Sequence, residues 1–154
     1  IALCFDQAGI PCEVTQNITA FIWGKALYNC CLNALSALFE APYGELMQCV
    51  DSYEIMTALI EEIFAVARRK GLQLLWDSPR EYRALLFGRL IPLTSTHHSS
   101  MFQDVKLGRR TEIDHLNGAI VRLGEEVEVP TPMNWLITRL IKIKEYQQRR
   151  PSRG

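Results

Sequence analysis

The chain has 154 residues, of which 48% are hydrophobic and 22% are charged, and its 17 basic side chains balance its 17 acidic ones. This length and composition are typical of one globular domain with its own core, and they exclude disordered, collagen-like and fibrous proteins. Because the formal net charge is zero, no overall field favours binding to nucleic acid or to an anionic membrane surface.

The compartment is indicated by the apolar runs, the amino end and the cysteines. No apolar run approaches the roughly 18 consecutive residues that a membrane-spanning helix needs. The first residues, IALCFDQAGIPCEV, lack the basic segment followed by an apolar one that marks a secretory signal. Five cysteines, an odd number with no C-x-x-C pair, indicate reduced thiols and not a disulfide framework. We therefore expect a cytoplasmic protein without a membrane or nucleic-acid partner.

The chain begins with Ile1 in the middle of a helical pattern. Residues 1–9 are typical of the last turns of a helix that ends at Gly9, and PCEVT at 11–15 is typical of a short extended segment. No G-x-G-x-x-G motif follows a strand, so these residues do not contain a dinucleotide-binding fold. We expect a piece of a longer protein.

From residue 17 onward the pattern is helical, with almost no strand signal and no internal repeat. Helices are expected over residues 17–40, 51–70, 79–90, 99–108 and 111–127, and from 132 into a flexible basic tail over 148–154. The expected amino-terminal caps are Asn17 or Thr19, Ser99 or Ser100, and Thr111, and the expected helix ends are at Pro42, Gly44, Gly71, Pro92 and Gly108. The sequence therefore predicts an all-α fold of about six helices.

Apolar residues that recur at steps of three and four residues indicate which helix faces point to the core. The expected inward residues are Phe21, Leu27, Cys31, Leu35, Leu38, Ile55, Leu59, Ile63, Val66, Met133, Leu136, Leu140 and Ile143. Cys30 and Cys31 fall inside this pattern, and we expect both to be small buried residues. His97 and His98 lack the ligand spacing of a zinc centre, so no metal site is expected.

Three polar residues of the first long helix, Lys25, Asn29 and Asn33, are each four residues apart. Because a step of four residues drifts by only about 40° around a helix, all three share one face and span about 12 Å of its axis. That length is enough to line one wall of a small-molecule pocket, where a bound polar ligand would satisfy the two amides. The simpler alternative is that this face is only the solvated side of the helix.

Glu112 and Ser100 are the other candidate site residues. Both stand near the start of an expected helix, where a carboxylate is favoured by the helix dipole and a hydroxyl can cap the backbone. Capping alone would explain either residue. A functional role is favoured by the pattern in which both residues occur.

Two blocks, WGKALYNCCLNALSAL and SSMFQDVKLGRRTEIDHLNGAIVRLGEEVEVPTPMNWL, resemble the carboxy-terminal domain of the ketopantoate reductases, also called 2-dehydropantoate 2-reductases. The phrases SSM-x-QD and TEID-x-LNG are the specific part, and the stretch 61–71 fits the same family. The resemblance implies a compact helical domain of the 6-phosphogluconate dehydrogenase C-terminal-like type over 17–147. It further implies that residues 1–16 are an extended remnant and linker of a dinucleotide-binding domain that carries NADPH.

The same resemblance implies reduction of ketopantoate to pantoate, on the way to pantothenate and coenzyme A. Lys25 matches the catalytic lysine, and Glu112 matches a glutamate that acts at the substrate and is also a candidate cofactor contact. Asn29, Asn33 and Ser100 match substrate-contacting residues. The expected partners are a small 2-oxo acid, the chain's own dinucleotide-binding domain and a second copy in a homodimer. Without the cofactor domain, the fragment is expected to be inactive.

Two alternatives remain open. A relative in the same helical superfamily would act on a different 2-oxo or 3-hydroxy acid, because pocket shape and not the proton donor sets the choice of substrate. A non-catalytic helical dimerisation module would pair its apolar faces with another subunit and use Lys25 and Glu112 only as a surface ion pair.

Overall fold

The computed structural model describes residues 2–149, and all regular structure in that range is helical, which confirms the predicted fold class. A π-helical turn at Leu86–Leu90 joins α5 to α6, and a 3-10 turn at Ile113–His115 precedes α8. None of these helices combines the length and apolar character needed to cross a membrane. The α-helices are α1 (Ala2–Gln7), α2 (Ile18–Phe39), α3 (Tyr43–Gln48), α4 (Val50–Arg69), α5 (Pro79–Leu85), α6 (Ile91–Leu93), α7 (Ser100–Lys106), α8 (Asn117–Glu126) and α9 (Pro132–Gln148).

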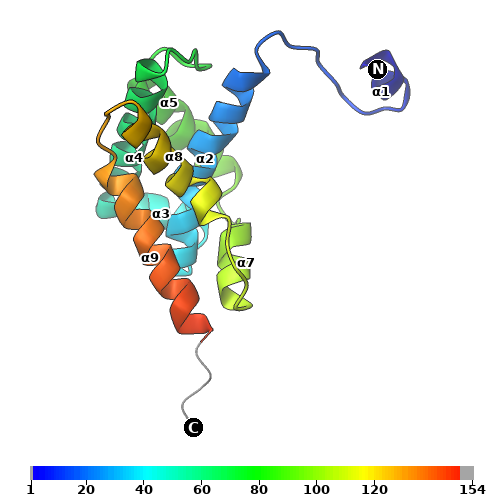
Figure 1. Ribbon diagram of the computed structural model, residues 1–154. Coiled ribbons are helices and arrows are strands. Elements are labelled where there is room, and N and C mark those ends of the chain that lie inside the picture. Colours follow the sequence, from blue (N-terminus) through cyan, green and yellow to red (C-terminus); the bar gives the residue numbers. More distant parts are fainter. Residues whose placement is uncertain (1, 150–154) are drawn as a thin grey trace.

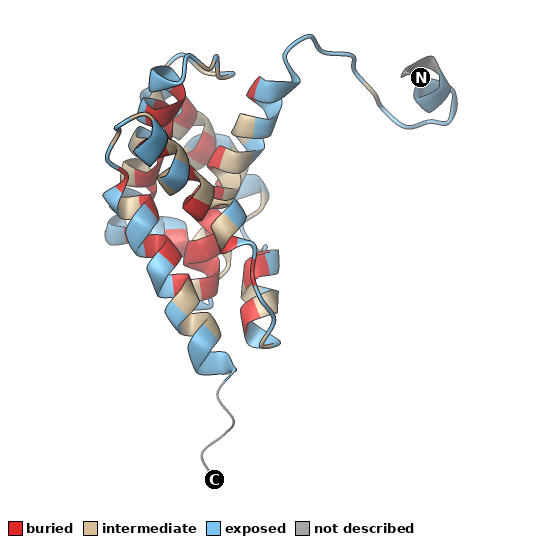
Figure 2. Cartoon of the chain, viewed as in Figure 1, coloured by how far each residue is buried: buried red, intermediate tan, exposed pale blue. Residues whose placement is uncertain are grey.

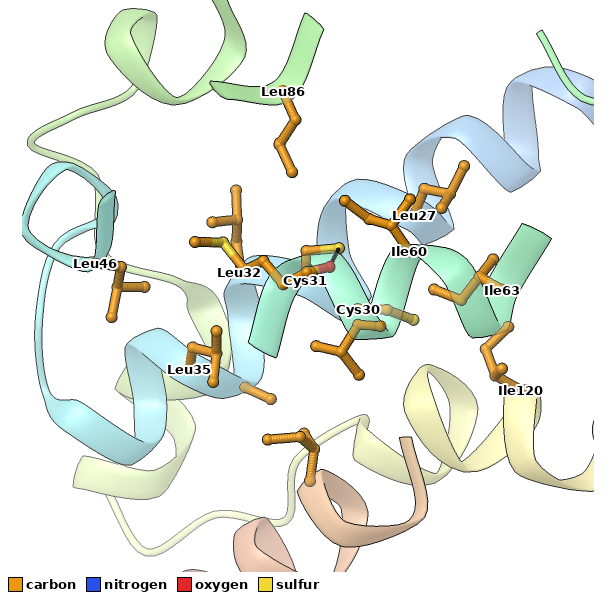
Figure 3. Close-up of a cluster of buried hydrophobic side chains, with 14 of the residues drawn as sticks. Leu27, Cys30, Cys31, Leu32, Leu35, Leu46, Ile60, Ile63, Leu86 and Ile120 are labelled. Carbon is orange, nitrogen blue, oxygen red and sulfur yellow. Dashed lines mark hydrogen bonds between the residues drawn. The ribbon is translucent and has the colours of Figure 1, made fainter. Parts of the chain in front are cut away.

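Helix α2 forms the centre of the helical body, with α4, α7 and α9 packed against it (Figure 1). Every residue from 30 to 37 is buried, so this half of α2 is enclosed on all sides (Figure 2). Figure 3 shows side chains from other elements around it, among them Leu46, Ile60 and Ile120. The first half of α2 is more open, and α1 with its linker extends away from the body (Figure 1).

The bounds of α2 and α4 agree closely with the sequence pattern. The side chain of Asn17 caps α2 by accepting a hydrogen bond from the backbone N–H of Ala20 at 3.2 Å. The helix ends because Glu40 adopts a left-handed backbone with φ of 55°, and the chain then enters the short helix α3, which the sequence pattern missed. Gly44 therefore lies inside α3 and is not a stop signal.

Pro92 does not break the third helix, contrary to the sequence prediction. The backbone widens into the π turn, in which the N–H of Ile91 bonds to the carbonyl of Leu86, five residues earlier. Helix α6 then starts afresh with Pro92 in its first turn, where a missing N–H costs little. The helical path consequently continues to Leu93.

The predicted helix over 111–127 is interrupted. The backbone leaves the helical region at Leu116, where φ and ψ are both −103°, and α8 begins only at Asn117. The buried side chain of Asn117 donates to the carbonyl of Cys30 at 3.1 Å and to the amide oxygen of Asn134 at 3.0 Å. These bonds to α2 and α9 fix the start of α8 and explain the break.

Helix α9 shows the clearest error in the predicted core. Leu136, Leu140 and Ile143 were expected to face inward, but they are 43%, 38% and 53% exposed. The buried face instead contains two polar and two apolar residues, Asn134, Ile137, Thr138 and Ile141. A periodicity argument cannot find this face, because Asn134 is stabilised by Asn117 and Glu62 on other helices, and the hydroxyl of Thr138 donates to the carbonyl of Asn134. Phe21 of α2 was also expected inside and is 48% exposed.

A polar junction orients α9. The carboxylate of Glu62 on α4 accepts hydrogen bonds from the backbone N–H groups of Met133 and Asn134 at 2.7 and 3.0 Å. It also accepts one from the side-chain amide of Asn134 at 2.7 Å. A carboxylate at a helix amino terminus satisfies unpaired donors and interacts favourably with the helix dipole.

The sequence predicts a flexible tail over residues 148–154. Residues 150–154 of this tail lie outside the described residues.

Gly44 allows α3 to approach the segment that follows α6. The N–H of Gly44 donates a hydrogen bond to the carbonyl of Ser95 at 2.8 Å. The N–H of the preceding residue, Tyr43, donates to the carbonyl of His97 at 3.0 Å. A Cβ atom at position 44 would lie 2.9 Å from the Cβ of Ser95 and 3.0 Å from its carbonyl oxygen. Only glycine fits this contact without displacement of the backbone.

Gly44→Ala should therefore lower the free energy of unfolding by about 1–3 kcal/mol, since the added methyl group overpacks against backbone. Urea unfolding followed by circular dichroism measures the change. Gly88→Ala is the matched control, because a Cβ there meets no atom within 4 Å. Equal stability of the two variants would contradict the close contact.

Glu62→Ala should lower the free energy of unfolding by about 2–3 kcal/mol, because it leaves three donors at the start of α9 without their acceptor. The neighbouring Glu61 pairs with Arg83 at the surface with 52% of its side chain exposed, so Glu61→Ala should cost less than about 1 kcal/mol. The same unfolding measurement compares the two. A larger loss for Glu61 would show that the junction does not orient α9.

Candidate functional site

All five candidate residues line one cleft of about 460 Å³. Lys25, Asn29 and Asn33 come from α2, Ser100 is the first residue of α7, and Glu112 lies directly before the 3-10 turn. The remaining lining residues are Tyr28, Tyr43, Thr94 and His97. Lys25, Asn29 and Asn33 thus share one face of α2, as the helical spacing predicted, and Ser100 and Glu112 from distant parts of the sequence line the same cleft.

The cleft deepens along α2. Lys25 is exposed, Asn29 is partly buried and Asn33 is only 5% exposed. The gradient follows from the fold, since the carboxy-terminal half of α2 is enclosed and its amino-terminal half is not. The ammonium therefore lies at the open end of the cleft and the amide of Asn33 at its closed end.

Four of these side chains have no protein partner. Within residues 2–149 the side chains of Lys25, Asn29, Ser100 and Glu112 form no hydrogen bond or ion pair. Lys144 is different, because its ammonium donates to the carbonyl of Leu38 at 2.8 Å and to Glu40 at 3.0 Å. Polar groups that converge on a concave surface without internal partners are typical of a ligand site. Lys25 and Glu112 line the same cleft but form no ion pair within residues 2–149.

Glu112 is held in place through its neighbours. On one side the backbone N–H of Thr111 donates to Glu145 of α9 at 2.6 Å, and on the other Ile113 is 1% exposed. Asp114 then pairs with Lys142 of α9 at 2.6 Å, and this hydrogen bond holds the pKa of the Asp114 carboxyl below its usual value. The backbone around Glu112 is thus fixed while its own carboxylate stays available.

Ser100 is not the cap of α7. That role belongs to Ser99, whose hydroxyl accepts from the N–H of Phe102 at 3.0 Å and donates to the carbonyl of Asn33 at 2.9 Å. Ser99 is buried and Ser100 is exposed toward the cleft. The capping explanation for Ser100 is therefore wrong.

The sequence reasoning missed an aromatic wall. The rings of Tyr28 and Tyr43 meet edge to face at 6.0 Å, and the ring of Tyr43 lies 5.5 Å from that of His97. The hydroxyls of Tyr28 and Thr94 are 2.9 Å apart, and Thr94 donates to the carbonyl of Leu90 at 2.9 Å. Tyr28 was within reach of the helical pattern, since it follows Lys25 by three residues. No spacing in the sequence links Tyr43 or His97 to α2.

The family described as "Ketopantoate reductase PanE/ApbA C terminal" matches residues 17–145. The chain belongs to this family. It is 43% identical to the 2-dehydropantoate 2-reductase of Aquifex aeolicus over 145 residues, which are 94% of this chain and 46% of that protein. It is 32% identical to the enzyme of Pyrococcus horikoshii over 92% of this chain and 45% of that one. The chain thus spans about half the length of the curated relatives it matches and corresponds to their carboxy-terminal half.

Solved structures agree with this assignment. A PanE/ApbA family ketopantoate reductase from Ralstonia eutropha JMP134 superposes with a TM-score of 0.87 at 38% identity, covering 97% of this chain and 48% of that one. A D-mandelate dehydrogenase in a ternary structure with NADH and anilino(oxo)acetate superposes with a TM-score of 0.86 at 30% identity, covering 96% of this chain and 60% of that one. Both a ketopantoate reductase and an oxidoreductase of another name therefore share this helical fold.

The two adjacent cysteines of α2, Cys30 and Cys31, are buried in the core, as predicted. Burial, with a smaller contribution from the charge of Glu112, raises the pKa of Cys30 to about 12. Burial likewise raises the pKa of Cys31 well above its ordinary value. Hydrogen bonds from the backbone and side chain of Ser52 lower the pKa of the exposed Cys49. Thiolates are the nucleophilic form, so these residues differ in reactivity.

Iodoacetamide at neutral pH should therefore alkylate Cys49 in the folded protein and leave Cys30 and Cys31 unmodified. Peptide mass spectrometry locates the label. Unfolding in urea should expose all three cysteines to the reagent. In the Cys49→Ser variant, the label at position 49 should be lost. Labelling of Cys30 at the rate of Cys49 in the folded protein would contradict its burial.

Proposed function

We propose that this chain is the substrate-binding and catalytic half of an NADPH-dependent ketopantoate reductase, which reduces ketopantoate to pantoate on the route to pantothenate and coenzyme A. The observation that carries the proposal is the cleft in which an ammonium, a carboxylate, a hydroxyl and two amides converge. Membership of the ketopantoate reductase family supports the same reaction.

The reaction requires a proton donor at the substrate oxygen. Reduction of a ketone carbon develops negative charge on its oxygen, and a fixed cation that can also donate a proton stabilises that charge. Lys25 fits this role, since its ammonium is unpaired within the described residues and lies at the open end of the cleft. The proton moves from the Nζ atom of Lys25 to the carbonyl oxygen of the substrate.

Glu112 and the neutral side chains orient the substrate. The carboxylate of Glu112 accepts a hydrogen bond from the substrate hydroxyl and attracts the ammonium of Lys25 across the cleft. Asn29, Asn33 and Ser100 donate to the carboxylate and carbonyl of the oxo acid. Such fixed donors reduce the freedom of the substrate before the reaction.

The cofactor would be bound mainly outside residues 17–147, through a dinucleotide-binding domain joined by residues 1–16. NADPH, when bound, supplies the hydride. The exposed positions of Lys25 and Glu112 fit a cofactor that approaches from the open end of the cleft, and Glu112 is its candidate contact in this chain. In this proposal the chain alone binds the oxo acid but does not reduce it.

A second candidate is reduction of a different 2-oxo acid. The similarity to a D-mandelate dehydrogenase, whose ternary structure contains anilino(oxo)acetate, supports this candidate. So does the wall of Tyr28, Tyr43 and His97, because aromatic rings pack well against a bulky apolar substituent.

Lys25→Ala in the complete reductase should lower kcat by about 10²–10⁴-fold, because the general acid is removed. The thermal midpoint should change little, since Lys25 makes no internal bond in residues 2–149. Lys70→Ala is the matched control, as Lys70 pairs with Glu126 at 2.9 Å at the surface, and it should retain full activity. Oxidation of NADPH is followed with ketopantoate and, separately, with phenylglyoxylate.

Retention of the ketopantoate rate by the Lys25 variant would overturn the catalytic assignment. A wild-type preference for phenylglyoxylate over ketopantoate would favour the second candidate. Turnover of neither substrate would favour a non-catalytic module.

A further inference from the structure

The closed end of the cleft contains a hydrogen bond between two buried side chains. The phenol of Tyr43, which is 2% exposed, donates to the amide oxygen of Asn33 at 3.0 Å, and Asn33 is 5% exposed. Both residues line the cleft, but only Asn33 was a candidate substrate contact from the sequence. The bond joins α3 to α2 across 10 positions in the chain.

The backbones of both partners are fixed independently. The carbonyl of Asn33 accepts from the hydroxyl of Ser99 at 2.9 Å. The N–H of Tyr43 donates to the carbonyl of His97 at 3.0 Å, and the contact between Gly44 and Ser95 holds α3 against the same segment. The ring of Tyr43 is further enclosed between those of Tyr28 and His97. The phenol therefore has little freedom to leave the amide oxygen of Asn33.

This bond decides which end of the Asn33 amide is left for a ligand. The amide oxygen is used by Tyr43, while the NH₂ group has no acceptor within residues 2–149. The fully buried side-chain nitrogen and oxygen atoms that lack a partner do not include the Asn33 nitrogen. This nitrogen is therefore accessible, and it faces the cleft that Asn33 lines. Burial raises the pKa of Tyr43, with a smaller contribution from Tyr28, so the phenol keeps the proton that it donates.

We propose that Tyr43 is a positioning residue that holds the Asn33 amide with its NH₂ group facing the cleft, so that the closed end of the cleft takes the carboxylate of the substrate. The exposed hydroxyl of Ser100, which lines the same cleft and follows Ser99, can supply a second donor. An amide NH₂ group and a hydroxyl that both donate favour a carboxylate over a group that must itself donate. The inference rests on the proposed function, because the anion is taken to be the oxo acid.

The complete reductase with Tyr43→Phe tests the proposal. Without the phenol, the amide of Asn33 is free to turn its oxygen toward the substrate carboxylate. We expect KM for ketopantoate to rise about tenfold, equal to one lost hydrogen bond of about 1.4 kcal/mol, with kcat and KM for NADPH within about twofold. Tyr82→Phe is the matched control, since its buried hydroxyl has no partner in the described structure and lies outside the cleft, and it should leave KM unchanged.

A double-mutant cycle separates positioning from packing. If Tyr43 acts through Asn33, then Tyr43→Phe should add nothing to the rise in KM that Asn33→Ala causes alone. Additive effects would overturn the proposal, as would an unchanged KM in the single Tyr43 variant. If Lys25→Ala abolishes turnover while Tyr43→Phe has no effect, this inference fails and the proposed function stands.

A measurement without substrate tests the geometry itself. In the ¹⁵N-labelled chain, Tyr43→Phe should shift the side-chain NH₂ resonances of Asn33 and leave those of Asn134, whose amide bonds to Glu62, in place. Unshifted Asn33 resonances would overturn the proposal even if the reductase were active. Shifted Asn33 resonances, together with a complete protein that reduces no oxo acid, would support the Tyr43 contact and overturn the proposed function.

Discussion

The enclosure of one half of α2 is the constraint on which the rest of the molecule depends. Residues 30 to 37 are buried on every side, so neighbouring helices must approach this half from all directions. They leave the other half open, and a polar face that runs along both halves therefore passes from solvent into the protein. The cleft is the consequence, with a charged group at its mouth and an amide at its end.

Polar contacts supplement the apolar core in orienting the helices. An apolar stripe turns one face of a helix toward the core, and a hydrogen bond with a fixed partner restricts the rotation further. Asn117 bonds to α2 and α9, and Glu62 bonds to the start of α9. The phrase TEID-x-LNG thereby combines a candidate site residue, Glu112, with a residue that anchors the same segment, Asn117.

The sequence was sufficient for the all-helical fold class, for the bounds of α2 and α4 and for the family, because these depend on short spacings or on a specific motif. The sequence was insufficient where the orientation of a side chain depends on a partner far away in the chain. Asn134 faces inward since Glu62 and Asn117 bind it, and the outward position of Leu136 follows from the same rotation. Tyr43 reaches the cleft through the contact of Gly44 with Ser95, which no local pattern reveals. The roles of the five candidates in binding and catalysis stay predictions.

The π turn at Leu86–Leu90 has a consequence for the chain's tolerance of insertions and deletions. A π turn contains one residue more than the α-helical turn it replaces, so removing a single residue there would restore ordinary α-helix. Because the shorter α-helical turn would cover nearly the same rotation, the residues that follow would keep their directions, among them Thr94, whose hydroxyl meets that of Tyr28. In the regular helix α4, by contrast, removing one residue would rotate everything that follows by about 100°. The stretch Leu86–Leu90 is therefore a place where the fold tolerates the loss of one residue.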